Sequence, residues 1–416
     1  MAKDVNPPRG NRDFLPLEKQ KREQVLGVIV DTYRSHGFQQ IEAPVMEDLA
    51  RLTSGQGGDN EKLAFRVMKR GEELSRAIAA NGDTNPDGEA GADNLADLGL
   101  RYDLTVPLTR YYATNFSKLP KVFKAIQTGP VFRAERPQKG RYRQFVQCDI
   151  DIIGDNSELA EIELLNASLD ALAAIGLADA TIRVNHRALL TANIQALGVE
   201  EADASSAMIT IDKLDKLGIQ GVVAEMNEKF GGAVAAMTGQ WLHNIADDKE
   251  IPEAIANIFT LVGAVHADKL RFDPTLVRGM GYYTGAIFEI EHPESGSSIG
   301  GGGRYDGMVG RWLGTDVPAV GISIGFERAV DLVGDDLTSE ASGIVLVIDD
   351  EPAAIAAGLR LQAQLIATGE EQVRLERRPK KLNLLLENLA GHGFGRFAFV
   401  SAEMASVADL EIKNIA

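Results

Sequence analysis

The chain has 416 residues, 44% of them hydrophobic and 25% charged, a balance typical of a globular protein that folds into two or three domains. Its formal net charge of −17 argues against a protein that coats nucleic acid with its whole surface, although it leaves room for a local basic face. No stretch approaches the roughly 20 apolar residues needed to span a bilayer, and the first residues carry neither a signal core nor a transit pattern, so we expect a cytoplasmic protein.

Cysteine and histidine usage gives no sign of a metal centre. Cys148 is the one cysteine, which excludes an intramolecular disulfide and a multi-cysteine metal cage. It lies in an alternating apolar run, so we predict a thiol on a strand and not a nucleophile. The six histidines show no metal-ligand spacing, and we predict no metal site.

The N-terminal part begins with a helix and a short strand. An apolar stripe at helical spacing predicts a helix from about Leu17 to Gly37. Residues 39–44 (QQIEAP) are typical of a short strand ended by proline. Residues 71–98 are rich in Gly, Asp, Asn and Ala, and we predict a long mobile insertion there with no chemistry of its own.

Residues 122–154 predict two antiparallel strands joined by the turn PQKGRY. In the second strand one face is apolar, and the other carries Phe145, Gln147, Asp149 and Asp151. A row of polar groups along one side of a sheet is costly to bury unless it faces a ligand. This face is therefore a candidate binding surface.

Helix-rich and strand-rich segments alternate in the rest of the chain. A helix is expected from Ser157 to Gly176, and residues 185–265 are mostly helical in pattern. Strands resume at Leu270 and continue through a Gly-rich turn to AVGISIG, before the helix FERAVDLV. From Gly343 onward a βαβαβ pattern predicts a small parallel-sheet domain.

Basic residues are dense between Lys118 and Arg143, where Glu135 is the only acid. Several arginines near Phe145 would suit a polyphosphate and a stacked base. An exposed hairpin with surface ion pairs of ~0–1 kcal/mol each explains the same residues equally well. The hairpin alone does not decide between these two interpretations.

Two further segments favour a nucleotide site. In GISIGFER (321–328) the glycines let a flat ring lie close to the backbone with Arg328 above it, although a strand–helix corner explains the same glycines. In LVRGMGYYTGAIFE (276–289) a core strand would explain Tyr282 and Tyr283 but not Arg278.

Together these segments resemble class II aminoacyl-tRNA synthetases, and within that class the histidyl-tRNA synthetases. The resemblance is carried by FRAERPQKGRYRQFVQCDIDIIG (132–154) and by residues 276–289. Further blocks occur in matching order, namely RGNRDFLP, LRYDLTVPLTR, IDKLDKLG and GGGRYDG. The resemblance covers almost the whole chain.

The resemblance implies an α+β fold, with a catalytic domain whose antiparallel sheet is flanked by helices, a helical insertion and a C-terminal α/β anticodon-binding domain. Residues 1–184 and 266–336 would form the catalytic domain, residues 185–265 the insertion and residues 342–416 the anticodon-binding domain. The resemblance also implies a homodimer, with the first helix and the 39–44 strand at its interface.

The implied activity is that of a ligase. It would activate L-histidine with ATP, which is bound together with Mg²⁺, and transfer the histidyl group to tRNA(His), releasing AMP and pyrophosphate. Arg133 and Arg278 would be catalytic because both reach the α-phosphate. Histidine would be bound by Asp103, Thr105, Gln147, Asp151, Tyr282 and Tyr283, and ATP by Arg133, Glu135, Arg141, Phe145 and Arg328.

Two rival functions are weighed against this one. A non-catalytic histidine-sensing paralogue that regulates ATP phosphoribosyltransferase would be expected to lose Arg278 and the C-terminal domain, and this chain has both. An adenylating enzyme for a carrier protein would lack an anticodon-binding domain, and the basic stretch RLERRPKK argues against it. Three features depart from the family pattern: Gly281 where Asp is frequent, the long 71–98 segment and a short C-terminal end.

Overall fold

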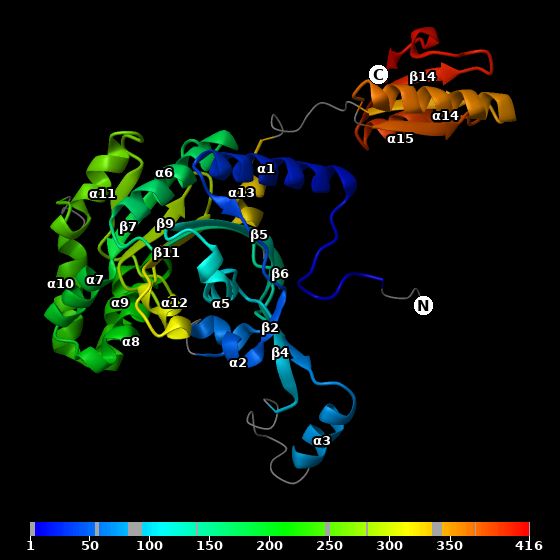
Figure 1. Ribbon diagram of the computed structural model, residues 1–416. Coiled ribbons are helices and arrows are strands. Elements are labelled where there is room, and N and C mark those ends of the chain that lie inside the picture. The colour runs from blue at the N-terminus through cyan, green and yellow to red at the C-terminus, as the bar shows by residue number, and fades with distance from the viewer. Residues whose placement is uncertain are drawn as a thin grey trace. The chain divides into compact units, whose positions relative to one another are not determined.

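The computed structural model describes residues 5–54, 58–81, 94–138, 140–245, 250–279, 282–334, 343–370 and 372–415. The chain divides into two compact units, one made of residues 1–13 with 25–333 and the other of residues 14–24 with 334–416. Figure 1 traces both units in chain order. The first helix, α1 (Pro16–Ser35), lies close to its predicted bounds.

An eight-stranded sheet forms the centre of the first unit. Its strand order is β1-β5-β6-β11-β10-β9-β7-β8. Neighbouring strands are antiparallel, apart from the parallel edge pairs β1 with β5 and β7 with β8. The strands are β1 (Gln39–Gln40), β5 (Phe123–Phe132), β6 (Gln144–Ile153), β7 (Thr181–His186), β8 (Leu270–Phe272), β9 (Ala286–Glu291), β10 (Gly300–Arg304) and β11 (Ala319–Ile324).

The predicted antiparallel pair is confirmed as β5 and β6. Phe123 lies opposite Ile153 and Phe132 opposite Gln144, so the two strands pair along their whole length. Cys148 is a buried strand residue, as predicted, and burial raises the pKa of its thiol. The polar face of β6 therefore points away from this thiol.

The Gly-rich segment is a strand, and the prediction of a turn there was wrong. Gly300–Gly303 belong to β10, which lies between β9 and β11. A Cβ atom on Gly302 would lie only 1.9 Å from the carbonyl oxygen of Gly321 on β11, so a side chain does not fit there. Glycines give no hydrophobic alternation, which is why the sequence pattern did not reveal this strand.

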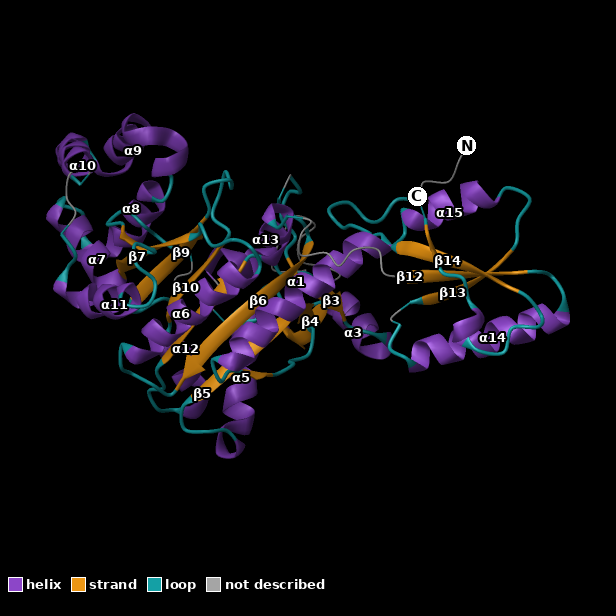
Figure 2. Cartoon of the chain, turned by 90° about the horizontal axis from the view of Figure 1, so that it is seen from above, coloured by secondary structure: helices purple, strands orange, loops and turns teal. Residues whose placement is uncertain are grey.

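Helices cover the sheet (Figure 2), and apolar side chains of its strands are buried in the core that they form together. Helix α6 (Leu159–Ala174) packs against β6 and β11. Helices α5 (Thr105–Asn115) and α12 (Asp306–Leu313) pack against each other, and their side chains join a core that includes Phe123 and Ile153. Helix α13 (Phe326–Leu332) follows β11 directly and packs against β6.

A small antiparallel sheet corrects the prediction for residues 71–98. Its strand order is β2-β4-β3. Residues 71–98, for which a mobile insertion was predicted, contain the helix α3 and the start of strand β4. The run GEELSRAIAAN consists largely of good helix formers, which the Gly-, Asp- and Asn-rich residues after it obscured. Residues 82–93 lie outside the described residues. The elements are β2 (Met46–Asp48), α2 (Leu49–Leu52), β3 (Arg66–Met68), α3 (Gly71–Asn81) and β4 (Ala96–Leu100).

Between β7 and β8 the chain is helical, as predicted, and has a hydrophobic cluster of its own. That cluster includes Leu190, Met208, Val222 and Met226, and it also takes in Val277 from the segment before β9. The helices are α7 (Arg187–Ala196), α8 (Ala204–Ile211), α9 (Leu214–Phe230), α10 (Gly232–Asn244) and α11 (Glu253–Gly263).

The second unit has the predicted βαβαβ order. Strand β12 pairs in parallel with both β13 and β14, and β15 adds an antiparallel edge. Its elements are β12 (Gly343–Ile348), α14 (Pro352–Ala367), β13 (Val373–Arg377), α15 (Leu382–Ala390), β14 (Phe394–Val400) and β15 (Lys413–Asn414). Within the described residues, no helix combines the length and the apolar character that crossing a bilayer requires.

Candidate active site

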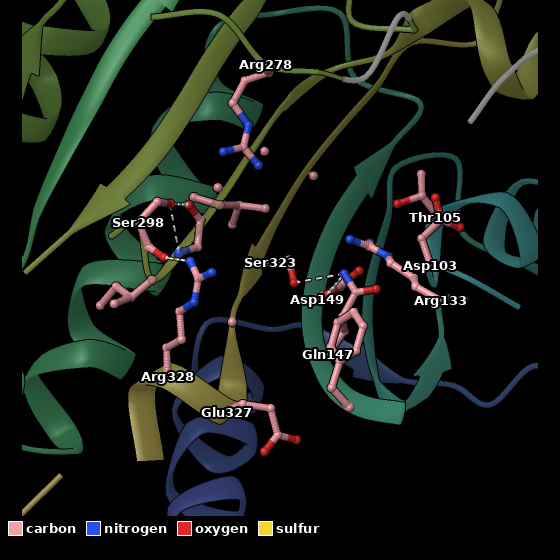
Figure 3. A pocket seen from close by; sticks show the side chains of 18 of the residues that line it. Asp103, Thr105, Arg133, Gln147, Asp149, Arg278, Ser298, Ser323, Glu327 and Arg328 are labelled. Carbon is pink, nitrogen blue, oxygen red and sulfur yellow. Dashed lines mark hydrogen bonds between the residues drawn. The ribbon is translucent and has the colours of Figure 1, made fainter. Parts of the chain in front are cut away.

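A cavity of about 510 Å³ lies over the polar face of β6. Figure 3 shows Arg278 and Arg328 on one side of it, and Asp103, Arg133 and Gln147 on the other. The structure brings together in this cavity all twelve residues that the sequence predicted for histidine and ATP: Asp103, Thr105, Arg133, Glu135, Arg141, Phe145, Gln147, Asp151, Arg278, Tyr282, Tyr283 and Arg328.

Cross-strand partners continue from the floor of this cavity, where Gly301, Ser323 and Asp149 line it, toward both edges of the sheet. One row crosses six strands in register: Arg183 on β7, Glu289 on β9, Gly301 on β10, Ser323 on β11, Asp149 on β6 and Gln127 on β5. Directly paired residues lie on the same face of a sheet, so this row is a single polar stripe.

Glycines in the floor leave room for functional side chains. A Cβ atom on Gly301 would lie 2.8 Å from Cζ of Arg278. On the next strand, a Cβ atom on Gly321 would lie 2.0 Å from Oδ1 of Asp151. The glycines thus allow Arg278 and Asp151 to lie against the backbone.

Three buried carboxyl groups line one side of the cavity. Asp103 accepts a hydrogen bond from the backbone N–H of Val106 at 3.1 Å, and Asp151 accepts one from the hydroxyl of Tyr305 at 2.6 Å. Burial raises the pKa of Asp103 to about 6 and that of Asp151 to about 7. Burial, followed by the charge of Asp151, also raises the pKa of Asp149. Such a group of acids favours a cationic ligand.

Tyrosine rings stand next to these acids. The rings of Tyr282 and Tyr283 are 4.8 Å apart in an edge-to-face arrangement, and Tyr282 also contacts Tyr305 with a centroid distance of 6.1 Å. Tyr305 carries the hydroxyl that bonds Asp151. Aromatic walls beside a carboxyl group suit a flat ring that carries N–H donors.

Arginines surround the rest of the cavity. Nε of Arg133 donates to the carbonyl of Tyr102 at 3.0 Å, and its guanidinium carbon lies 5.1 Å from the centroid of the Phe145 ring. Arg141 is half exposed and lies 3.4 Å from a carboxylate oxygen of Glu135. Phe145 therefore already has a planar cation over its ring.

The opposite side of the cavity carries Arg278 and Arg328. Arg278 donates from Nη1 to Glu289 at 2.9 Å, and Arg328 donates to the carbonyl of Ser298. Burial, followed by the nearby Arg141 guanidinium, lowers the pKa of Arg328. Crowding of two guanidinium groups is relieved when an anion lies between them, as a phosphate would.

Within the part of the chain that the structure describes, four buried polar atoms of the cavity have no hydrogen-bond partner: Oδ2 of Asp103, Oδ2 of Asp151, Oε1 of Gln147 and Nε of Arg278. Leaving such an atom unpaired costs about 1–3 kcal/mol. Three of the four atoms are acceptors and the fourth is a cationic donor. The cavity is therefore arranged for a ligand that has donors at one end and an anionic group at the other.

The site contains residues that were not predicted as ligands. Asp149, Ser323, Tyr305 and Glu327 also line the cavity. Asp149 had a signal in the sequence, because it shares a face of β6 with Gln147 and Asp151. The other three lie in quoted blocks without an assigned role: Ser323 on β11 and Glu327 on α13 belong to GISIGFER, and Tyr305, between β10 and α12, belongs to GGGRYDG.

Arg304, in the quoted block GGGRYDG, has a structural role. It is buried, and its Nε and Nη2 both donate to the Glu161 carboxylate at 2.6 Å. Among the residues that the structure describes, no group of three or more His, Cys, Asp or Glu side chains is arranged to hold a metal ion. Gly281, the departure noted in the tyrosine-bearing segment, lies outside those residues.

The known proteins that resemble this chain agree with the chemistry of the cavity. The sequence model described as Histidyl-tRNA synthetase matches residues 10–82 and 93–329. A histidine--tRNA ligase of Leifsonia xyli is 52% identical over 441 aligned residues, which span 100% of this chain and 99% of that protein. A probable histidine--tRNA ligase of Tropheryma whipplei is 38% identical over 95% of this chain and 96% of its own length.

Solved structures show the same fold. The histidyl-tRNA synthetase of Nostoc sp. PCC 7120 superposes with a TM-score of 0.76 at 24% identity, covering 99% of this chain and 95% of that one. A Bacillus halodurans protein titled as an ATP phosphoribosyltransferase regulatory subunit/histidyl-tRNA synthetase superposes with a TM-score of 0.72 at 18% identity, covering 92% and 96%. At these identities the likeness concerns the fold alone.

Proposed function

Because the chain belongs to the histidyl-tRNA synthetase family, we propose that this cavity joins L-histidine to ATP and that the enzyme then passes the histidyl group to tRNA(His). The activity is that of a histidine--tRNA ligase. The observation that carries the assignment of the site is the pairing of three unpartnered acceptors with a ring of arginines in one cavity.

The acidic side of the cavity is the proposed histidine site. Oδ2 of Asp103 and Oε1 of Gln147 are free to accept from the α-ammonium group, with Thr105 beside them. Oδ2 of Asp151 is free to accept from a ring N–H, and Tyr283 lines the same end. A site that bonds both ends of histidine rejects isosteres, because each missing donor leaves a buried acceptor unpaired.

The arginine side is the proposed ATP site. A carboxylate oxygen of histidine attacks the α-phosphorus of ATP, a P–O bond forms, and the bond to the bridging oxygen breaks as pyrophosphate leaves. Negative charge builds on the phosphoryl oxygens, and fixed cations lower the barrier. We assign Arg133 and Arg278 to the α-phosphate, Arg141, Arg328 and Glu135 to the outer part of the nucleotide with its Mg²⁺, and Phe145 to the adenine.

This chemistry requires no general base, since the attacking group is already a carboxylate. The ionised state of the substrate therefore explains why the site contains cations and acceptors but needs no Ser/His/Asp arrangement. We further propose that residues 342–416 bind the anticodon, that the protein is a homodimer through the first helix and residues 39–44, and that it acts in the cytoplasm.

An ATP–pyrophosphate exchange assay with each of the standard amino acids tests the proposed function. Exchange is expected with histidine alone, followed by charging of tRNA(His) when that tRNA is added. Exchange with a different amino acid would contradict the assignment of the acidic side. Tight histidine binding without any exchange would instead favour the regulatory function that was weighed against the enzyme.

A further inference from the structure

We propose that Glu289 is a positioning residue that aims Arg278 at the α-phosphate, an inference that rests on the proposed function. Glu289 does not line the cavity over β6 that holds the predicted ligands. It acts through Arg278, which does line that cavity and whose guanidinium Glu289 holds.

Arg278 lies between β8 and β9, where the described residues, 273–279 and 282–285, form no helix or strand. Its neighbours Leu276 and Val277 are buried in two different hydrophobic clusters, that of the sheet and that of the helical segment. The backbone at Arg278 is therefore anchored, but its long side chain needs a contact of its own to fix its direction.

Glu289 provides that contact. Its Oε2 accepts from Nη1 of Arg278 at 2.9 Å, and the two side chains are only 17% and 24% exposed. No other hydrogen bond of the Arg278 side chain occurs within the described residues, and its Nε is buried without a partner. Gly301, the strand partner of Glu289, has no side chain and lets the guanidinium lie on the sheet.

Arg183 fixes Glu289 from the other side. It is the strand partner of Glu289 on β7, and its Nη1 lies 3.1 Å from Oε1, the oxygen that Arg278 does not use. Arg183 is itself buried, and its Nε donates to Asp273 at 2.7 Å. A charge-assisted bond on each oxygen leaves the Glu289 carboxylate little freedom to turn.

The same arginine offers a matched control. Glu291 lies two residues further along the same face of β9, and its Oε1 is 3.2 Å from Nη1 of Arg183. Its other oxygen accepts from Arg271 at 2.7 Å, and among the described contacts it makes none with Arg278. Glu289→Gln and Glu291→Gln thus each remove one carboxylate charge next to Arg183. Only Glu289→Gln weakens the hold on Arg278, because its amide has one acceptor oxygen left for two guanidinium groups.

The experiment compares both variants with the wild type in histidine-dependent pyrophosphate exchange. Glu289→Gln is expected to lower kcat by about 10- to 100-fold, the effect of misplacing a catalytic group by about 1 Å. KM for histidine is expected to stay within about twofold, because Glu289 touches no proposed histidine ligand, and Glu291→Gln is expected to keep kcat within about threefold of the wild type. Thermal unfolding of each variant measures the structural effect of the substitution.

The outcomes separate this inference from the proposed function. Equal kcat values for both variants would overturn the inference while the exchange activity of the wild type stands. A loss of kcat in Glu289→Gln that tracks a fall in melting temperature, with Glu289→Asp no better, would reduce Glu289 to a stabilising residue. Absence of exchange in the wild type would overturn the proposed function itself.

Discussion

Replacing Arg278 with alanine is expected to lower histidine-dependent pyrophosphate exchange by about 10³-fold, the upper range for removing one fixed donor from a developing oxyanion. The buried Nε of Arg278 has no partner among the described residues, so a donor is already in place for a phosphoryl oxygen. That donor interacts most strongly when negative charge builds on the phosphoryl oxygens in the transition state. We therefore expect kcat to fall more than the affinity for histidine.

A matched substitution distinguishes catalysis from folding in this experiment. Arg271 lies on β8, its side chain is 58% exposed and it pairs with Glu291. Arg271→Ala therefore removes a nearby arginine that also pairs with a carboxylate of β9 but does not line the cavity. The melting temperatures of both variants are expected to lie close to that of the wild type. If Arg278→Ala turned over at a rate near that of the wild type, the assignment of Arg278 would be wrong.

Replacing Asp151 with asparagine is expected to lower kcat/KM for histidine by about 10²- to 10³-fold. Removing one partner of a buried, hydrogen-bonded charged contact costs about 2–5 kcal/mol, and each 1.4 kcal/mol corresponds to a factor of ten. Asparagine keeps an oxygen that accepts from Tyr305, so the local packing is preserved. KM for ATP is expected to change little, because the ATP ligands lie elsewhere in the cavity.

The same substitution is expected to stabilise the protein in the absence of histidine at pH 8. Burial raises the pKa of Asp151 from 3.8 to about 7, so the folded chain binds more protons than the unfolded chain between these two values. Stability of the wild type therefore falls as the pH rises through this window, by up to about 1.4 kcal/mol per unit of pKa difference. The asparagine side chain does not ionise, so the loss is absent in the Asp151→Asn variant.

Thermal unfolding at several pH values measures this effect. At pH 8 the melting temperature of Asp151→Asn is expected to exceed that of the wild type by at least about 2 °C, the shift that about 1 kcal/mol produces in a domain of this size. The difference is expected to shrink toward pH 4, and Asp331→Asn at an exposed position serves as the control. A variant that is less stable than the wild type at pH 8 would show that ionised Asp151 does not destabilise the folded protein.

Local patterns in the sequence determined much of the architecture. Alternation in residues 144–153 predicted β6 and its polar face, and the βαβαβ order predicted the second unit. Periodicity works there because side chains point in directions that repeat every two residues along a strand and about every 3.6 along a helix. A buried face is therefore visible within a short stretch of sequence. The resemblance between the sequence blocks and the family named twelve ligands, and the fold gathers them in one cavity; their chemical roles stay predictions until the substitutions above are measured.

The contacts that hold these residues in place depend on how the strands pair in the folded chain. Gly300–Gly303 form a strand because they pair with β9 on one side and β11 on the other. A run of glycines has no hydrophobic alternation from which a strand could be predicted. Glu289 belongs to a quoted segment of the sequence, yet its bond to Arg278 depends on the register of β7, β9 and β10. Cross-strand contacts join residues that are far apart in the chain, so residue type and spacing predict the cations and acceptors of the site, whereas strand pairing alone determines what holds them in place.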